Sequence, residues 1–111
     1  MIRALLVGSF AVLMTAAASF AVAQDVAKGE KLFADQRCSL CHSVAGKGNA
    51  KGPLDEVGST LTADEIREWI VDAKGMTAKM KAERKPAMRQ YNLPKEDVDA
   101  LVAYLSTLKK K

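Results

Sequence analysis

The sequence is poor in the residues that most often bind metals or form disulfide bonds. It contains only two cysteines and one histidine among 111 residues. A tetrahedral zinc site needs four ligands, so these three residues cannot complete one without help from carboxylates. No segment alternates apolar and polar residues with a period of two, and no glycine spacing fits a phosphate-binding loop. These absences favour a small helical domain, and they argue against a nucleotide-binding enzyme.

The charge of the chain is also modest. Its 17 Lys and Arg residues and 13 Asp and Glu residues give a formal net charge of +4. The basic residues are interleaved with acidic ones and form no continuous stripe, so nucleic-acid binding is not predicted. A small positive balance is instead compatible with an acidic protein partner.

The first 23 residues have the layout of a secretory signal peptide. Arg3 is followed by an uncharged, alanine-rich stretch that closes on the small-x-small sequence AVA. The alternative is an uncleaved membrane anchor, but small and polar residues within the stretch make it a weak spanning helix. We therefore expect cleavage after Ala23. Residues 24–111 would then form a single domain with no membrane span.

Both cysteines and the only histidine lie within five residues, in the sequence CSLCH at 38–42. A disulfide here would close a very small loop, and a thioredoxin-like redox pair would need a βαβ context that the sequence lacks. The remaining interpretation is covalent haem attachment. In this arrangement Cys38 and Cys41 add to the two vinyl groups of the porphyrin, and His42 binds the iron from one face. The motif thus predicts one haem c with iron.

Apolar residues recur at helical spacing in three segments, and each segment has a start or stop signal. Asp25 can cap the first helix, the capping box that begins at Thr62 starts the second, and Pro94 suits the first helical position of the third. The second helix is expected to end at Gly75. The glycine-rich segment 43–61 is expected to be irregular in secondary structure but ordered around a ligand. The predicted fold class is therefore all-α.

Taken together, the CSLCH motif, the Gly-Pro-Leu stretch at 52–54 and the LVAYL sequence at 101–105 resemble a class I c-type cytochrome, a small soluble monohaem protein. The resemblance implies the cytochrome c fold, a small helical domain wrapped around one covalently attached haem. It also implies that the N- and C-terminal helices cross, with a glycine and an aromatic residue of one helix packed against a leucine and an aromatic residue of the other. The corresponding residues here are Gly29, Phe33, Leu101 and Tyr104.

The sixth coordination position of such an iron decides the function. Since His42 is the only histidine, a second imidazole ligand is excluded, and the soft thioether of methionine is the natural candidate. The resemblance implies Met88, which precedes the last helix, although Arg89 stands where the family often has proline. Met76 and Met80 are expected to face solvent or to be partly packed. Met80 is the alternative ligand.

Two further residues are implied by the same resemblance. The backbone carbonyl of Pro53 would accept a hydrogen bond from the ring of His42, and the indole of Trp69 would meet a haem propionate. Each residue also has a simpler interpretation, Pro53 as an ordinary turn proline and Trp69 as an ordinary core residue.

With both axial positions filled, no open iron site remains for a substrate. The sequence therefore predicts a monomeric, periplasmic single-electron carrier without enzymatic activity. It would shuttle electrons between redox partner proteins with acidic docking surfaces. The alternative is a haem-based ligand-binding or peroxidase-like protein in which Met88 is a labile ligand.

Overall fold

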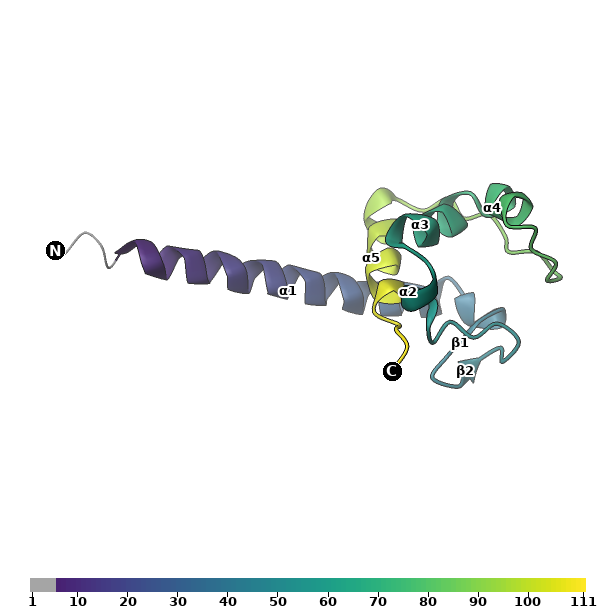
Figure 1. The fold of residues 1–111 in the computed structure, drawn as a ribbon, viewed down its shortest axis with the longest axis horizontal. Helices are drawn as coiled ribbons and strands as arrows, with labels where there is room; N and C mark the ends of the chain where they lie inside the picture. Colours follow the sequence, from purple (N-terminus) through teal and green to yellow (C-terminus); the bar gives the residue numbers. More distant parts are fainter. Residues whose placement is uncertain (1–5) are drawn as a thin grey trace.

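A computed structural model describes the backbone of residues 6–111 and the side chains from residue 21 onward. This part of the chain is mostly helical, with one short hairpin (Figure 1), which confirms the predicted fold class. In chain order the elements are α1 (Leu6–Asp35), the 3-10 helix η2 (Cys38–Leu40), β1 (Ser43–Val44), β2 (Lys47–Gly48), α2 (Val57–Thr60), α3 (Ala63–Val71), α4 (Ala73–Lys79) and α5 (Lys95–Ser106).

The first helix is longer than the sequence predicts. It begins at Leu6, so Asp25 lies inside α1 and does not cap its start. The alanine-rich stretch before Asp25 has high helix propensity and no proline, so the helix continues through it. The N-terminal part of α1 extends away from the other elements (Figure 1). Cleavage after Ala23 stays a prediction, and Arg3 lies outside the described residues.

The described part of the chain contains no helix that is both long and apolar enough to cross a membrane.

Helices α1 and α5 cross and pack closely against each other (Figure 1). Gly29 lies at the crossing, where an added Cβ atom would collide with the carbonyl oxygen of Ala100 and would lie 2.6 Å from Cβ of Tyr104. One turn further along α1, the rings of Phe33 and Tyr104 meet edge to face. The predicted helix crossing is confirmed. The direct partners of Gly29 are Ala100 and Tyr104, whereas Leu101 packs in the same core as Phe33.

The core is formed mainly by α3 and α5 beside the end of α1. Ile66 and Ile70 of α3 pack with apolar residues of α5, and each is at most 5% exposed. Burial of such a side chain contributes about 1.5–3 kcal/mol. The contributing residues of α5 are Val98, Leu101, Val102, Tyr104 and Leu105. Residues of this core also line the cavity at the candidate site.

The predicted capping box at Thr62 is present, but the helix that it begins is shorter than expected. The Glu65 amide donates to the Thr62 hydroxyl (3.2 Å), and the Thr62 amide donates to the Glu65 carboxylate (2.9 Å). Helix α3 then ends at Val71, because Asp72 leaves helical geometry (φ −143°, ψ 57°). The Asp72 carboxylate accepts a hydrogen bond from the Gly75 amide (3.2 Å) and caps α4. Gly75 therefore lies inside α4 and does not end a helix.

The glycine-rich segment 43–61 contains more regular secondary structure than predicted. Strands β1 and β2 pair antiparallel, with Ser43 opposite Gly48, and the chain then returns so that Ser43 also bridges Pro53. The backbone of Ser43 bonds Gly52 and Leu54 on this returning segment (3.0 and 2.8 Å). Gly48 has a positive φ of 111°, and an added Cβ atom there would collide with the carbonyl oxygen of His42. The hairpin therefore folds tightly over the residue that follows the two cysteines.

Candidate functional site

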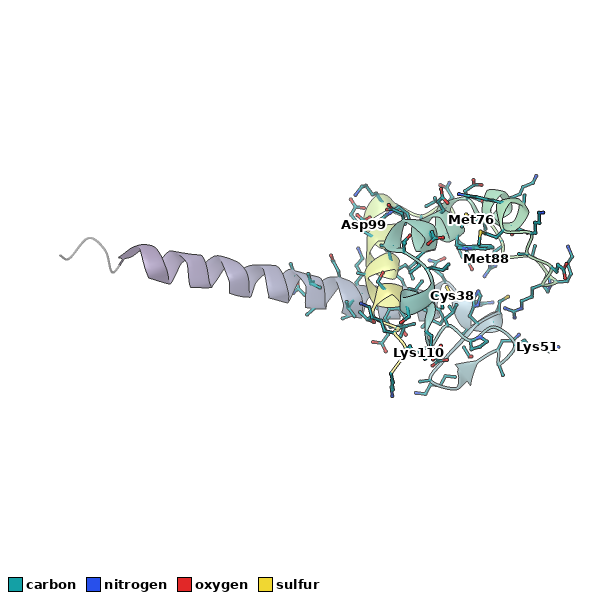
Figure 2. All side chains as sticks on the ribbon, viewed as in Figure 1. Cys38, Lys51, Met76, Met88, Asp99 and Lys110 are labelled. Carbon is teal, nitrogen blue, oxygen red and sulfur yellow. The ribbon has the colours of Figure 1, made fainter. Side chains whose placement is uncertain are left out.

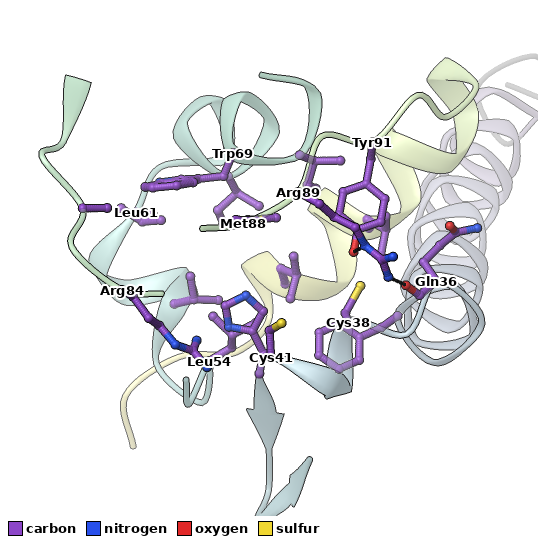
Figure 3. Close-up of a pocket in the computed structure, with 18 of the residues that line it drawn as sticks. Gln36, Cys38, Cys41, Leu54, Leu61, Trp69, Arg84, Met88, Arg89 and Tyr91 are labelled. Carbon is purple, nitrogen blue, oxygen red and sulfur yellow. Dashed lines mark hydrogen bonds between the residues drawn. The ribbon is translucent and has the colours of Figure 1, made fainter. Parts of the chain in front are cut away.

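A cavity of about 870 Å³ lies between the end of α1, the 3-10 helix η2, helices α3 and α5, and the segment that joins α4 to α5. Its volume is within the range of roughly 300–1,000 Å³ that is usual for ligand and cofactor sites. The walls are mostly apolar, with Leu54, Leu61, Ile66, Leu101 and Leu105 among the lining residues. Figure 3 shows part of this lining.

The tight turn at residues 38–42 brings both cysteines and the histidine to this cavity. The amides of Cys41 and His42 both donate to the carbonyl oxygen of Cys38 (3.2 and 3.0 Å), which winds the five residues into one turn. Both thiols are free and half-buried, and both cysteines line the cavity (Figure 3). His42 is half-buried and lines it as well. Three residues that could attach and ligate one group are thus held together by a local turn.

The ring of His42 is held by the residue before the predicted one. Its Nδ1 atom lies 3.1 Å from the carbonyl oxygen of Gly52, so Pro53 is not the hydrogen-bond acceptor. The bridge between Ser43 and Pro53 turns the Gly52 carbonyl toward the ring, and the Ser43 amide shares that acceptor (3.0 Å). Because a carbonyl only accepts, Nδ1 carries the proton and Nε2 has a free lone pair. That tautomer is the one a metal-binding histidine needs.

The environment of the turn also shifts the protonation of its side chains. Burial lowers the pKa of His42, the hydrogen bond to Gly52 opposes this effect, and the positive charge of Arg84 lowers the pKa further. Burial raises the pKa of the Cys38 thiol, and its contact with Tyr91 acts in the opposite direction. A redox-active cysteine has a depressed pKa, so Cys38 does not have the character of a thioredoxin-like nucleophile.

The three candidate methionines lie in different environments. Met88 is half-buried and lines the cavity, where it lies across from Cys41 (Figure 3). Met80, at the end of α4, lines the same cavity but is 50% exposed. Met76, labelled in Figure 2, is only 3% exposed, so the expectation that it faces solvent or is only partly packed is wrong. Helix α3 ends before Asp72, and α4 begins after it with a different apolar face. Met76 lies on the buried face of α4.

Trp69 is half-buried and lines the cavity on the same side as Met88 (Figure 3). The location agrees with a residue that contacts a bound group. The propionate contact itself stays a prediction.

Three other residues lie at the cavity, and the sequence gives little indication of one of them, Tyr91. Arg84 and Arg89 come from the segment between α4 and α5 and line the rim, and Tyr91 lies beside Arg89. The Arg89 Nε atom donates to the Tyr91 hydroxyl (3.1 Å), and the guanidinium lies 5.3 Å from the centre of the tyrosine ring. An aromatic residue three positions after Met88 is the only signal in the sequence that could have drawn attention to Tyr91.

The residues at this cavity fit a c-type haem. Two free thiols and an imidazole with an available Nε2 atom come from one turn, and a thioether lies across the cavity from that turn. Thiols for covalent attachment, imidazole and thioether form the donor set of a six-coordinate haem iron in an electron carrier. The mostly apolar walls match the apolar faces of a porphyrin.

Comparison with known proteins agrees with this site. Residues 26–109 match the cytochrome c family. The chain therefore belongs to the cytochrome c family, and its single CSLCH motif makes it a monohaem cytochrome c. A curated relative is cytochrome c oxidase subunit 2 from Alkalihalophilus pseudofirmus, 33% identical over 91 residues. The match covers 74% of this chain but only 25% of that subunit, so the chain spans a quarter of its length. No solved structure gives a significant match.

Proposed function

We propose that the protein is an exported single-electron carrier with one c-type haem, attached through Cys38 and Cys41 and ligated by His42 and Met88. When bound, such a haem supplies a one-electron change in the oxidation state of iron. Membership of the cytochrome c family supports haem-based electron transfer in general. The ligand set, the export and the partners are our proposals.

The observation that carries the proposal is the arrangement of the four side chains around one apolar cavity. The two cysteines would tether the group, while Gly52 holds the ring of His42 in one orientation. Met88 would close the remaining axial position. If the apolar walls exclude water from a bound haem and both ligands stay in place, electron transfer would require little structural rearrangement.

A second function has support from one observation. Met88 lies in a segment that forms neither helix nor strand, so its position is not set by regular hydrogen bonding. A segment of this kind could release the thioether and open the sixth position. The protein would then bind small ligands at the iron or act as a weak peroxidase.

Absorbance spectra of the purified haem protein distinguish the two functions. We expect the oxidised wild type to show a low-spin spectrum with the sulfur-to-iron charge-transfer band, and the reduced wild type to bind carbon monoxide slowly. Met88→Ala should lose the band and bind carbon monoxide readily. Met80→Ala is the matched control, because Met80 lines the same cavity, and it should retain the wild-type behaviour.

Two results would contradict the proposal. If the band were lost in Met80→Ala and kept in Met88→Ala, Met80 would be the ligand. If the wild type itself bound carbon monoxide readily at neutral pH, the ligand-binding function would be favoured over electron transfer.

We further propose that the carrier operates in the periplasm after cleavage behind Ala23 and docks on acidic surfaces of redox proteins. Exposed basic residues support such docking: Arg84 lines the cavity, and Lys81 and Lys85 each adjoin a lining residue in sequence. Lys51 is exposed as well. The relative named as a subunit of cytochrome c oxidase supports an oxidase as one class of partner. N-terminal sequencing of the exported protein tests the cleavage. Electron-transfer rates that fall as salt rises would support the docking charges.

A further inference from the structure

The segment that joins α4 to α5 carries Met88 but contains no helix or strand. Nothing in regular backbone pairing therefore determines where the Met88 thioether lies. Its position must depend on contacts that the segment makes with the rest of the domain.

Two consecutive side chains after Met88 make such contacts, and they reach two different helices. Arg89 donates from Nη2 to the carbonyl oxygen of Gln36, just beyond the end of α1 (3.3 Å) (Figure 3). Gln90 donates from its side-chain amide to the carbonyl oxygen of Val71, the last residue of α3. The segment is thus attached on both sides of the cavity immediately after Met88.

Both acceptors are carbonyl oxygens at C-terminal ends of helices. Such carbonyls lack a partner within the helix and accept hydrogen bonds from side chains. The C-terminal end of a helix also carries partial negative charge, which favours the guanidinium of Arg89 at α1. Each hydrogen bond therefore satisfies a carbonyl oxygen that the helix itself leaves without a partner.

Arg89 has a second contact that restricts its orientation. Its Nε atom bonds the Tyr91 hydroxyl (3.1 Å) while the guanidinium lies over the tyrosine ring. Tyr91 is half-buried and belongs to the residues packed against the core. The planar guanidinium thus bonds Tyr91 through Nε and Gln36 through Nη2.

We infer that Arg89 and Gln90 are positioning residues that hold the Met88 thioether at the iron by fastening its segment to the ends of α1 and α3. Neither residue would be an iron ligand. They would set the fraction of molecules in which the Met88 thioether occupies the sixth coordination position of the haem iron. The inference rests on the proposed function, because it takes Met88 as the ligand.

The test uses the purified haem protein in four variants, Arg89→Ala, Arg89→Lys, Gln90→Ala and Arg67→Ala. Two readouts are the sulfur-to-iron band of the oxidised protein and the rate of carbon monoxide binding to the reduced protein. A hydrogen bond of this kind corresponds to a change of roughly two- to tenfold in an equilibrium. We expect Arg89→Ala and Gln90→Ala each to accelerate carbon monoxide binding by about that factor and to weaken the band. Arg89→Lys should retain part of the wild-type behaviour, since lysine can still donate to Gln36.

Arg67→Ala is the matched control. Arg67 also uses its guanidinium in a hydrogen bond, but it bonds Asp99 on α5 (2.6 Å), and Asp99 lies well apart from Cys38 and Met88 (Figure 2). We expect this variant to reduce the midpoint of unfolding while leaving the band and the carbon monoxide rate unchanged.

The outcomes separate the inference from the proposed function. If Met88→Ala loses the band but Arg89→Ala and Gln90→Ala behave as wild type, the ligand assignment stands and the positioning inference is overturned. If Arg67→Ala changes the two readouts as much as Arg89→Ala, the effect is general destabilisation and the inference is again overturned. If Met88→Ala keeps the band, the proposed ligand itself is wrong.

Discussion

The rings of Phe33 and Tyr104 meet edge to face, with their centroids 5.9 Å apart and their planes inclined by 64°. Phe33 belongs to α1 and Tyr104 to α5, so the pair joins the two helices that cross. Phe33 also lines the cavity. The contact therefore links the helix crossing directly to the wall of the haem site.

This pair predicts a measurable coupling. Phe33→Leu and Tyr104→Leu should each lower the free energy of unfolding by about 1–2 kcal/mol, because volume is nearly conserved but the aromatic contact is lost. The double variant should lose less than the sum, with a coupling of about 0.5–1.5 kcal/mol. Denaturant unfolding of the four haem proteins measures the cycle. Strict additivity would show that the ring contact contributes no energy of its own.

Gly29→Ala should destabilise the protein although alanine is the better helix former. The added methyl group would meet the Ala100 backbone and Cβ of Tyr104, neither of which can rotate away. Overpacking of this kind costs about 1–3 kcal/mol, against a propensity gain of roughly 1 kcal/mol. Thermal unfolding followed by circular dichroism checks the result. Lys31→Ala, an exposed change on the same helix, should alter the unfolding free energy by less than about 0.5 kcal/mol.

Asp99 predicts a dependence of stability on pH. Hydrogen bonds from Lys95 (2.8 Å) and then Arg67 (2.6 Å) hold the pKa of its carboxyl below the usual value. A lowered pKa in the folded state means that the contribution is complete above the unfolded pKa of about 3.9 and disappears as pH falls through the folded pKa. Wild type should therefore exceed Asp99→Asn in stability at neutral pH, and the difference should vanish in acid.

Unfolding midpoints measured across this acid range test the expectation. Because the ion pairs are partly exposed, about 1 M salt should also reduce the difference between wild type and Asp99→Asn at neutral pH. A difference that persisted unchanged in acid would mean that the charge of Asp99 does not matter for stability.

The attachment of haem should depend on both cysteines. Cys38→Ser and Cys41→Ser should each leave one thioether, and the double variant should release its haem on extraction with acidified acetone. The pyridine haemochrome spectrum distinguishes two thioethers from one, because each saturated vinyl group shifts the absorption band. Ser39→Ala lies in the same turn and should leave attachment intact. Haem that remained covalently bound in the double variant would contradict the assignment.

The features that could be predicted from the sequence depend on residues close together along the chain. The turn at 38–42 closes through bonds to the Cys38 carbonyl, and the capping box joins Thr62 to Glu65 only three residues away. Apolar residues at helical spacing are also local signals, so the helix before the CSLCH motif and the helices after it could be predicted. The glycine at position 29 was informative because it is unfavourable in a helix unless another backbone approaches closely.

The features that were missed depend on contacts between distant segments. Gly52 rather than Pro53 accepts from His42 because the pairing of Ser43 sets which carbonyl faces the ring. The break at Asp72 decides that Met76 is buried, and helical spacing alone would have continued the helix. Asp25 lies inside α1 because the stretch before it is itself helical.

By itself the amino-acid sequence determined the chemistry of this protein, since two thiols, one imidazole and a few thioethers leave few ways to bind an iron porphyrin. The tertiary structure decided which backbone carbonyl holds His42 and which helix ends hold the residues after Met88. The physical reason is distance along the chain: Arg89 bonds a carbonyl 53 residues earlier, and no local pattern encodes a hydrogen bond across that separation.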